Sequence, residues 1–222
     1  MDFGQKFLIE QFLGERYIEQ DLLADNNKKY LERIAFYRKF GYDLEKEREF
    51  IIDKSLPFSG KILEIGTGKG HFAIALAKRG YNFTTIDISE ADQKFAKLNI
   101  KYYGFEDRVT FGIEDAEKLS FADNSFDTIF SINVFHHLVR PESALSEMAR
   151  LITTNGKIIL SDFNSNGMDI INSCHSYEGR AHDHFKNDIM LVINYFSKRG
   201  FNIREVQTDT ERTLIIEKND QI

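Results

Sequence analysis

From residue 57 onward, short apolar runs alternate along the chain with longer stretches whose apolar positions recur every three or four residues. The first pattern predicts buried strands and the second amphipathic helices. Strands that alternate with helices form a parallel sheet covered by helices on both faces. The predicted strands occupy 61–65, 81–87, 108–113, 126–132 and 156–163, and the predicted helices 72–80, 89–104, 141–152 and 187–200.

The last two apolar runs, 201–209 and 213–219, have no helical pattern between them. A few polar residues separate them, which predicts an antiparallel hairpin. The chain is therefore predicted to be an α/β protein with a doubly wound, mostly parallel, seven-stranded sheet and a C-terminal antiparallel hairpin.

Residues at the ends of the predicted helices agree with this division. Ser89 is suited to cap a helix N-terminus, and Pro141 to occupy a first helical turn. Glycines follow three helical patterns, where a left-handed residue ends a helix: Gly80, Gly104 and Gly200.

Residues 1–55 carry helical patterns rich in phenylalanine and tyrosine. One predicted helix lies within 25–41, begins at the asparagines there and ends at Gly41, and a second begins after Asp43. We divide the chain into an N-terminal helical cap, 1–56, and a main domain, 57–222. The aromatic side chains of the cap form a lid over a substrate or have only a packing role.

Composition narrows the classes of protein. The chain has 222 residues, a formal charge of −6 and one cysteine, Cys174. The negative charge makes nucleic acid a poor partner, and a single cysteine fits a reducing compartment. Residues 1–20 mix charged with apolar positions, and no apolar run is long enough for a membrane span. We expect a soluble cytoplasmic monomer or homodimer, with neither a membrane nor a nucleic acid as partner.

Three glycines at alternate positions, Gly66, Gly68 and Gly70, follow the first predicted strand directly. Such a loop lets a ligand lie against bare backbone at the N-terminus of the next helix. Asp87 ends the next predicted strand, at the spacing of a carboxylate that binds ribose hydroxyls. Together the two features indicate a nucleoside ligand. In the dinucleotide fingerprint a third glycine would occupy the place of His71, so NAD is the alternative ligand.

Several motifs in order resemble the class I S-adenosylmethionine-dependent methyltransferases, which have a Rossmann-like fold. The resemblance runs from Lys61 to Phe163 and rests on EIGTGKG, TTIDIS, EDAEKLSFADNSFDTIFSINVFHHL and ARLITTNGKIILSDF. It is nearest to the small-molecule enzymes that include the quinone-biosynthesis methyltransferases. S-adenosyl-L-methionine is the cofactor that the resemblance implies.

The resemblance also implies roles for single residues. Glu64 would orient the amino group of the methionine part, and Asp87 would bind both ribose hydroxyls. Ile88 would lie on an adenine face, while Asp115 would accept a hydrogen bond from the adenine amino group. The remaining expected contacts are the backbone of Gly66, Thr67, Gly68 and Gly70, the amide of Ala116, and Ser131 and Asn133 near the methionine and its methyl group.

Methyl transfer from a sulfonium needs mainly alignment of the acceptor and exclusion of water. A base helps only some acceptors, and we nominate His137 for that role. The other interpretation is that one ring of His136 and His137 hydrogen-bonds in the core and the other faces solvent or substrate.

A small organic molecule is the favoured acceptor. The proline pair typical of enzymes that methylate adenine or glutamine amides is absent from SINVF, and one cysteine cannot hold arsenic. The alternatives are an NAD-linked oxidoreductase and a non-catalytic module that binds S-adenosylmethionine.

The segment 174–185 departs most from the generic family pattern. It holds the potential metal ligands Cys174, His175, His182, Asp183 and His184. Their spacing does not decide between a metal site, a substrate-lining segment and a solvated connection, and we assign no metal ligand.

Overall fold

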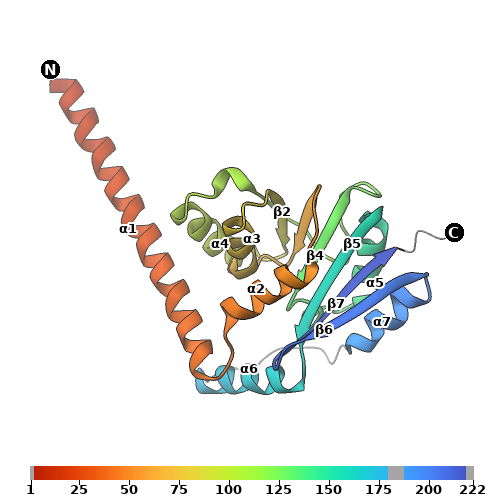
Figure 1. The fold of residues 1–222 in the computed structure, drawn as a ribbon. Coiled ribbons are helices and arrows are strands. Elements are labelled where there is room, and N and C mark those ends of the chain that lie inside the picture. Colours follow the sequence, from red (N-terminus) through yellow and green to blue (C-terminus); the bar gives the residue numbers. More distant parts are fainter. Residues whose placement is uncertain (1–2, 180–187, 219–222) are drawn as a thin grey trace.

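The computed structural model describes residues 3–179 and 188–218, with side chains described from residue 19 onward. Its centre is a seven-stranded sheet with the order β3-β2-β1-β4-β5-β7-β6 (Figure 1). β1 to β5 are parallel to one another, and β7 runs antiparallel to both of its neighbours, β5 and β6, so the predicted fold class is confirmed. The strands are β1 (Ile62–Ile65), β2 (Phe83–Asp87), β3 (Val109–Ile113), β4 (Phe126–Ile132), β5 (Ile152–Phe163), β6 (Phe201–Gln207) and β7 (Glu211–Lys218).

The strand order reverses between β1 and β4, which are neighbours although two strands separate them in the chain. In sheets of this kind the crevice at the carboxyl ends of the strands beside such a reversal is where ligands bind. The fold therefore directs attention to the segments that follow β1, β2 and β4.

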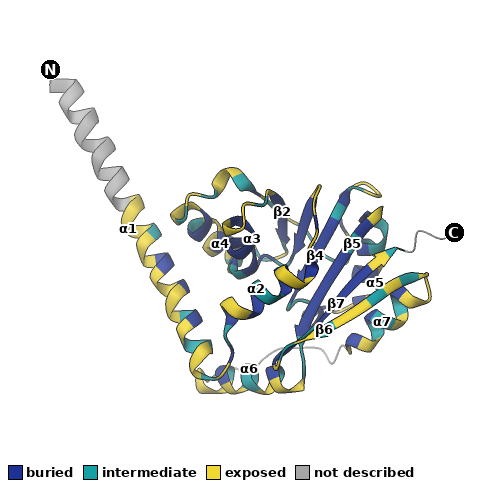
Figure 2. Cartoon of the chain, viewed as in Figure 1, coloured by how far each residue is buried: buried dark blue, intermediate teal, exposed yellow. Residues whose placement is uncertain are grey.

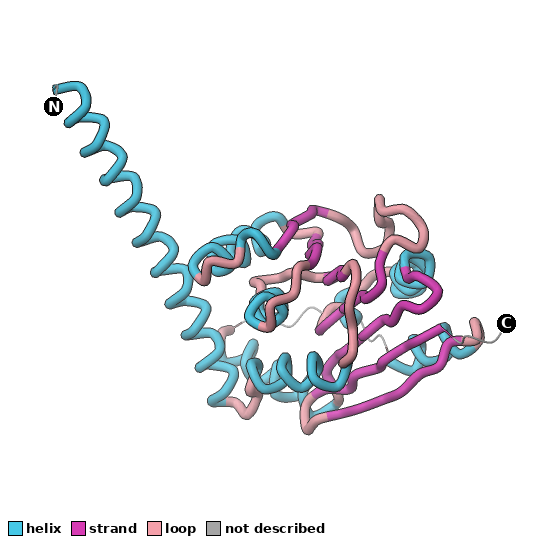
Figure 3. Tube along the Cα trace, turned by 45° about the horizontal axis from the view of Figure 1, so that its top comes forward, coloured by secondary structure: helices cyan, strands magenta, loops and turns pink. Residues whose placement is uncertain are grey.

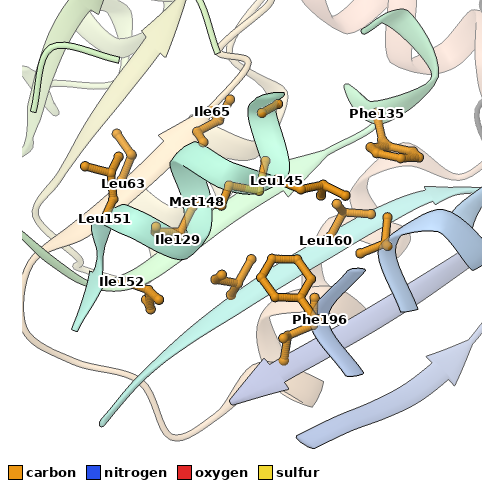
Figure 4. Close-up of a cluster of buried hydrophobic side chains, with 14 of the residues drawn as sticks. Leu63, Ile65, Ile129, Phe135, Leu145, Met148, Leu151, Ile152, Leu160 and Phe196 are labelled. Carbon is orange, nitrogen blue, oxygen red and sulfur yellow. The ribbon is translucent and has the colours of Figure 1, made fainter. Parts of the chain in front are cut away.

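Helices cover both faces of the sheet. On one face α3 (His71–Lys78) and α4 (Glu90–Tyr102) share a hydrophobic cluster with the strands, and on the other α5 (Pro141–Leu151) and α7 (Ile189–Ser197) share a second (Figure 4). Successive residues of β1 point to opposite faces, so Ile62 belongs to the first cluster and Leu63 to the second. The strands β1, β2, β4, β5 and β7 are buried along most of their length, whereas the edge strand β6 has no buried residue (Figure 2).

The N-terminal segment forms two helices, α1 (Phe3–Lys39) and α2 (Leu44–Ser55). The predicted helix start at the asparagines is wrong, because α1 passes through them without a break (Figure 3). Asn26 and Asn27 are buried, and Asn26 Nδ2 donates to the carbonyl oxygen of Phe95 on α4 at 3.1 Å. These amides therefore join α1 to α4 instead of capping a helix.

The other predicted helix ends are confirmed. Gly41 has φ +95 and ends α1, and the Asp43 side chain accepts from the backbone of Lys46 to begin α2. Ser89 caps α4, and Pro141 opens α5. The glycines with positive φ after α3, α4 and α7 are Gly80, Gly104 and Gly200.

One helix, α6 (Ser165–Tyr177), lies where no element was predicted. Its sequence is rich in serine and asparagine, and its first turn contains Gly167, where a Cβ atom would lie 2.0 Å from the carbonyl oxygen of Thr210. Asn164 caps it by accepting from the Gly167 amide. The helix is held by this close approach to the β6–β7 turn, which residue patterns do not reveal.

None of the helices that are described is long and apolar enough to cross a membrane.

Candidate functional site

A cavity of about 630 Å³ opens at the carboxyl ends of β1, β2 and β4. α2 contributes one side chain to its wall, Arg48. Of the residues expected to bind the cofactor, most line this cavity, and so does the nominated base. They are Glu64, Gly66, Thr67, Gly68, Asp87, Ile88, Asp115, Ala116, Asn133 and His137.

The loop after β1 is shaped by left-handed glycines. Gly66 has φ +89, and a Cβ atom there would lie 2.1 Å from Val134 Cγ2. Bare backbone is therefore needed at Gly66 for two reasons, its conformation and its neighbour. Thr67 is buried, and its hydroxyl is held by that of Thr85 at 2.6 Å and by Gln93 Nε2 at 3.1 Å.

Gly70 has a different place from the one predicted. It does not line the cavity, and a Cβ atom there would lie 2.9 Å from the Cβ of Ala96. Gly70 therefore lets α3 pack closely on α4.

Asp87 is half-buried at the end of β2 and faces the cavity. Its carboxylate accepts from the amide of Gly68 at 2.7 Å and from the amide of Ser89 at 2.8 Å. The side chain thus holds the glycine loop in place, a second task that the sequence did not indicate. Each carboxylate oxygen can still accept a further hydrogen bond.

Glu64 is 1% exposed, and its Oε2 atom has no hydrogen-bond partner in the described part of the chain. Burial raises the pKa of this carboxyl group to about 8. A buried carboxylate oxygen without a partner is costly, and a cationic ligand group would satisfy it.

Arg48 is the functional residue that the sequence analysis missed. It is 7% exposed, and its Nε atom has no partner among the residues described. The signal was available, because Arg48 lies on the buried face of α2 with Ile51 and Ile52. A cation on an apolar helix face needs a partner or a ligand. Arg48 and Glu64 line the same cavity. Their charges match those of an amino acid, with Arg48 suited to the carboxylate and Glu64 to the ammonium group.

A buried polar network supports Arg48 and the end of β4. Arg48 Nη1 lies 2.8 Å from Glu211 Oε1 and 3.1 Å from the hydroxyl of Tyr42. Asn133 Nδ2 donates to the same two groups at 3.1 Å each. Burial alone would raise the pKa of Glu211, but Arg48 and the other donors hold it below its usual value. Asn133 has φ +58, a conformation that asparagine tolerates.

The far end of the cavity is apolar. Ile88 is 72% exposed and Val139 69% exposed, and both line it. Two large aliphatic side chains left open to solvent beside a cavity suit a flat apolar ligand. Asp115 and Ala116 lie in the turn nearby, where Asp115 Oδ1 accepts from the Glu117 amide at 2.9 Å.

Ser131 lies outside the cavity. It is 1% exposed within β4, between β1 and β5, so the structure does not place it in contact with a ligand there. The prediction that it lies under the methionine part is not supported by this position.

The two adjacent histidines have different environments. His136 is buried, and its Nδ1 lies 2.6 Å from Asp162 Oδ1. His137 is exposed and lines the cavity, with its ring 4.0 Å from that of His136. One ring therefore hydrogen-bonds in the core and the other faces the ligand site.

The segment after β5 provides no metal site in the portion that is described, where no group of three or more potential ligands comes together. Cys174 is buried in α6, and burial raises the pKa of its thiol. The other potential ligands, His182, Asp183 and His184, lie outside the described residues.

Residues 63–160 match a family model described as a methyltransferase domain. Among curated proteins, the chain is 29% identical over 161 residues to the methyltransferase GfsG of Streptomyces halstedii, covering 69% of this chain and 56% of that protein. It is 31% identical over 128 residues to a ubiquinone biosynthesis O-methyltransferase of Dechloromonas aromatica, covering 56% of this chain and 54% of that protein. The chain thus spans just over half the length of these relatives.

Solved structures share the fold at low identity. A protein of Pyrococcus horikoshii has a TM-score of 0.67 and 19% identity, covering 86% of this chain and 92% of that one. A putative S-adenosyl-L-methionine-dependent methyltransferase of Methanococcus maripaludis has a TM-score of 0.65 and 21% identity, covering 87% and 93%. The [4+2]-cyclase SpnF also matches, with a TM-score of 0.62 and 14% identity, covering 78% and 81%.

The sheet order and the solved structures define the class of fold: a Rossmann-like, class I methyltransferase fold, with a cavity at the carboxyl ends of its strands. The match to a methyltransferase domain over residues 63–160 and the similar methyltransferases support the predicted resemblance to the S-adenosylmethionine-dependent methyltransferases.

Proposed function

We propose that this chain transfers the methyl group of S-adenosylmethionine to a small organic acceptor. The observation that carries the proposal is the buried carboxylate of Glu64. Its Oε2 atom lacks a hydrogen-bond partner among the described residues, and the group lies in one cavity with Arg48, the glycine loop and Asp87. An adenosyl amino acid has an ammonium, a carboxylate, two ribose hydroxyls and an adenine ring, and this cavity offers a matching group for each.

In this assignment Glu64 binds the ammonium group and Arg48 the carboxylate of the methionine part. Asp87 accepts from the ribose hydroxyls, and the adenine ring lies against Ile88 and Val139. Further contacts are assigned to the turn and to the loops after β1 and β4: Asp115, the amide of Ala116, the backbone of Gly66 and Thr67, and Asn133.

When bound, the cofactor supplies a methyl group on a sulfonium, which is a good leaving group. The chain must then hold the acceptor in line and exclude water. α1 and the end of α6 meet through ring contacts of Phe36 and Phe40 with Tyr177, and we assign them the role of a cover over the acceptor. We assign His137, which lines the cavity after β4, the role of taking a proton from an acceptor whose reacting atom reaches this cavity and must lose one.

The alternatives have less support. A dinucleotide fingerprint would require a third glycine at the position of His71. The chain has a histidine there, and its ring stacks on Tyr30 with 4.7 Å between the ring centroids. A non-catalytic module would keep the cavity without turnover. The [4+2]-cyclase SpnF has a similar fold. The fold alone therefore does not establish methyl transfer, and formation of S-adenosylhomocysteine must be measured.

The acceptor is proposed to be a small organic molecule rather than a nucleic acid, since the net charge is −6. A cytoplasmic monomer or homodimer fits the single cysteine.

Thermal unfolding with S-adenosylmethionine, S-adenosylhomocysteine or NAD tests the proposal. A ligand at about 100 times its dissociation constant stabilises by about 2.7 kcal/mol, which raises the melting temperature by several degrees. We expect a rise with both sulfur nucleosides and none with NAD. A rise with NAD alone would overturn the proposal, and S-adenosylhomocysteine formation over an acceptor panel separates an enzyme from a binding module.

A further inference from the structure

A second cavity, of about 290 Å³, lies between α1, α4 and the glycine loop. It adjoins the cofactor cavity, because Lys69 and His71 line both. Its volume is near the lower end of ligand sites, so it suits a molecule with a single ring. Its wall is formed by Asn26, Lys29, Tyr30, Arg33, Lys69, His71, Phe95, Asn99 and Glu178.

The charge of this wall is positive. It holds three cations, Lys29, Arg33 and Lys69, against one acid, Glu178. Lys29 pairs with Asp25 and Arg33 with Glu178. For Lys69 no ion pair exists within the described chain, and its ammonium nitrogen lies 5.7 Å from the centroid of the Phe95 ring. An anionic group would therefore find an uncompensated cation here.

Two buried polar atoms at the wall lack partners within residues 19–179 and 188–218. Asn99 is 1% exposed, and its Oδ1 accepts nothing; His71 Nδ1 is likewise buried and without a hydrogen bond. Burial, with Arg48, Lys69 and Arg33 nearby, lowers the pKa of His71 to about 3, so this ring is neutral. Unsatisfied buried atoms of this kind indicate a ligand that can donate a hydrogen bond.

Aromatic rings complete the wall. Tyr30 of α1 stacks on His71 with an interplanar angle of 22°, and Phe95 of α4 lines the cavity beside Asn99. Such rings favour a flat, unsaturated ligand.

We propose that this second cavity binds the acceptor, and that the acceptor is a small aromatic carboxylate with a hydrogen-bond donor on its ring. The inference rests on the proposed methyl transfer. The carboxylate contacts Lys69 and Arg33, and the ring donor satisfies Asn99 or His71.

Calorimetric titration with 4-hydroxybenzoate and its neutral amide, 4-hydroxybenzamide, tests this on protein saturated with S-adenosylhomocysteine. We expect the acid to bind at least tenfold more tightly than the amide, because a charge-assisted hydrogen bond is the stronger kind. Lys69→Gln and Arg33→Gln should each weaken the acid about tenfold and leave the amide unchanged. Lys28→Gln is the matched control, since Lys28 is on α1 and outside the cavity wall.

Equal affinity for acid and amide, no binding of either, or acid binding that both variants leave unchanged would overturn the inference. The two proposals fail separately. If wild-type protein binds S-adenosylhomocysteine but shows no preference for the acid, only this inference is lost. If it binds the acid through Lys69 and Arg33 but no sulfur nucleoside, the methyltransferase proposal is lost and the anion site remains.

Discussion

Arg48 Nη1 of α2 lies 2.8 Å from Glu211 Oε1 at the start of β7, and both side chains are buried directly beside the cofactor cavity. The N-terminal segment and the C-terminal hairpin thus meet at the site. Glu47 strengthens the same junction by accepting from Thr208 Oγ1 at 2.8 Å and Thr210 Oγ1 at 2.6 Å. The guanidinium group of Arg48 therefore has a fixed position before any ligand binds.

Arg48→Met is expected to lower both stability and nucleoside affinity. Removing one member of a buried ion pair leaves the other charge uncompensated, which costs about 3 kcal/mol of the free energy of unfolding. Denaturant titration measures this loss. The variant should also bind S-adenosylhomocysteine at least tenfold more weakly but keep its affinity for 5′-methylthioadenosine, which lacks the carboxylate.

Arg212→Met is the control for Arg48→Met. Arg212 pairs with Glu205 on the partly exposed hairpin, where an ion pair contributes at most about 1 kcal/mol. An Arg48→Met protein that loses both nucleosides equally would show that Arg48 is structural and not a carboxylate ligand.

The raised pKa of Glu64 predicts that the stability of the protein depends on pH. The pKa of Glu64 in the folded protein is about 8, against an ordinary value of 4.5, so between these values the folded state binds a proton that the unfolded state has lost. The free energy of unfolding should therefore fall as pH rises through this window, by up to about 1.4 kcal/mol per unit for this site. Glu64→Gln should lack this contribution. Denaturant titrations at pH 5, 6, 7 and 8 measure the difference, and Glu142→Gln, an exposed residue, is the control.

The same carboxyl group links binding to protons. An ammonium group favours the ionised form of Glu64, so binding of S-adenosylhomocysteine near pH 6.5 should release a proton. Calorimetry in two buffers with different ionisation enthalpies detects that proton, and Glu64→Gln should abolish its release. Unchanged proton release in the variant would assign it to another group.

Asp87→Ala should remove the stabilisation by S-adenosylmethionine and S-adenosylhomocysteine. The variant loses the acceptor for the ribose hydroxyls and also the hydrogen bond that holds the Gly68 amide. Thermal unfolding with and without ligand measures the effect. Asp107→Ala, at an exposed position away from the cavity, should keep the full ligand response. A full response in Asp87→Ala would contradict the ribose assignment.

Gly66→Ala should damage the site more than Gly80→Ala, although the two glycines have nearly equal φ angles of +89 and +86. Both changes place a side chain in the left-handed region, at a cost of about 1–2 kcal/mol. Only Gly66 adds a clash, with Val134, because nothing lies within 4 Å of a Cβ atom at Gly80. We expect Gly66→Ala to lower the free energy of unfolding by several kcal/mol more than Gly80→Ala does. We also expect the Gly66→Ala variant to lose nucleoside binding. Equal losses, measured by denaturant titration, would refute the close approach of Val134.

The sequence predicted the strands, the sheet with its hairpin, and most of the residues around the cofactor cavity. It could do so because the glycine loop and Asp87 follow successive strands, and parallel strands bring their carboxyl ends together. Two of the predicted residues do not line the cavity. Gly70 and Ser131 fit the motif by spacing, but only packing shows that Gly70 lies close to Ala96 and that Ser131 is enclosed by β1 and β5.

The chain's own pattern determined the α/β order and the loop for a nucleoside, because hydrophobic periodicity and turn residues act over a few neighbouring positions. Tertiary structure alone decided that Arg48 lines the same cavity as Glu64, that Glu211 holds Arg48, and that α1 joins α4 around a second, positively charged cavity. These contacts join residues far apart in the chain. Their energies come from burial and from charge at short range, and no local pattern encodes either.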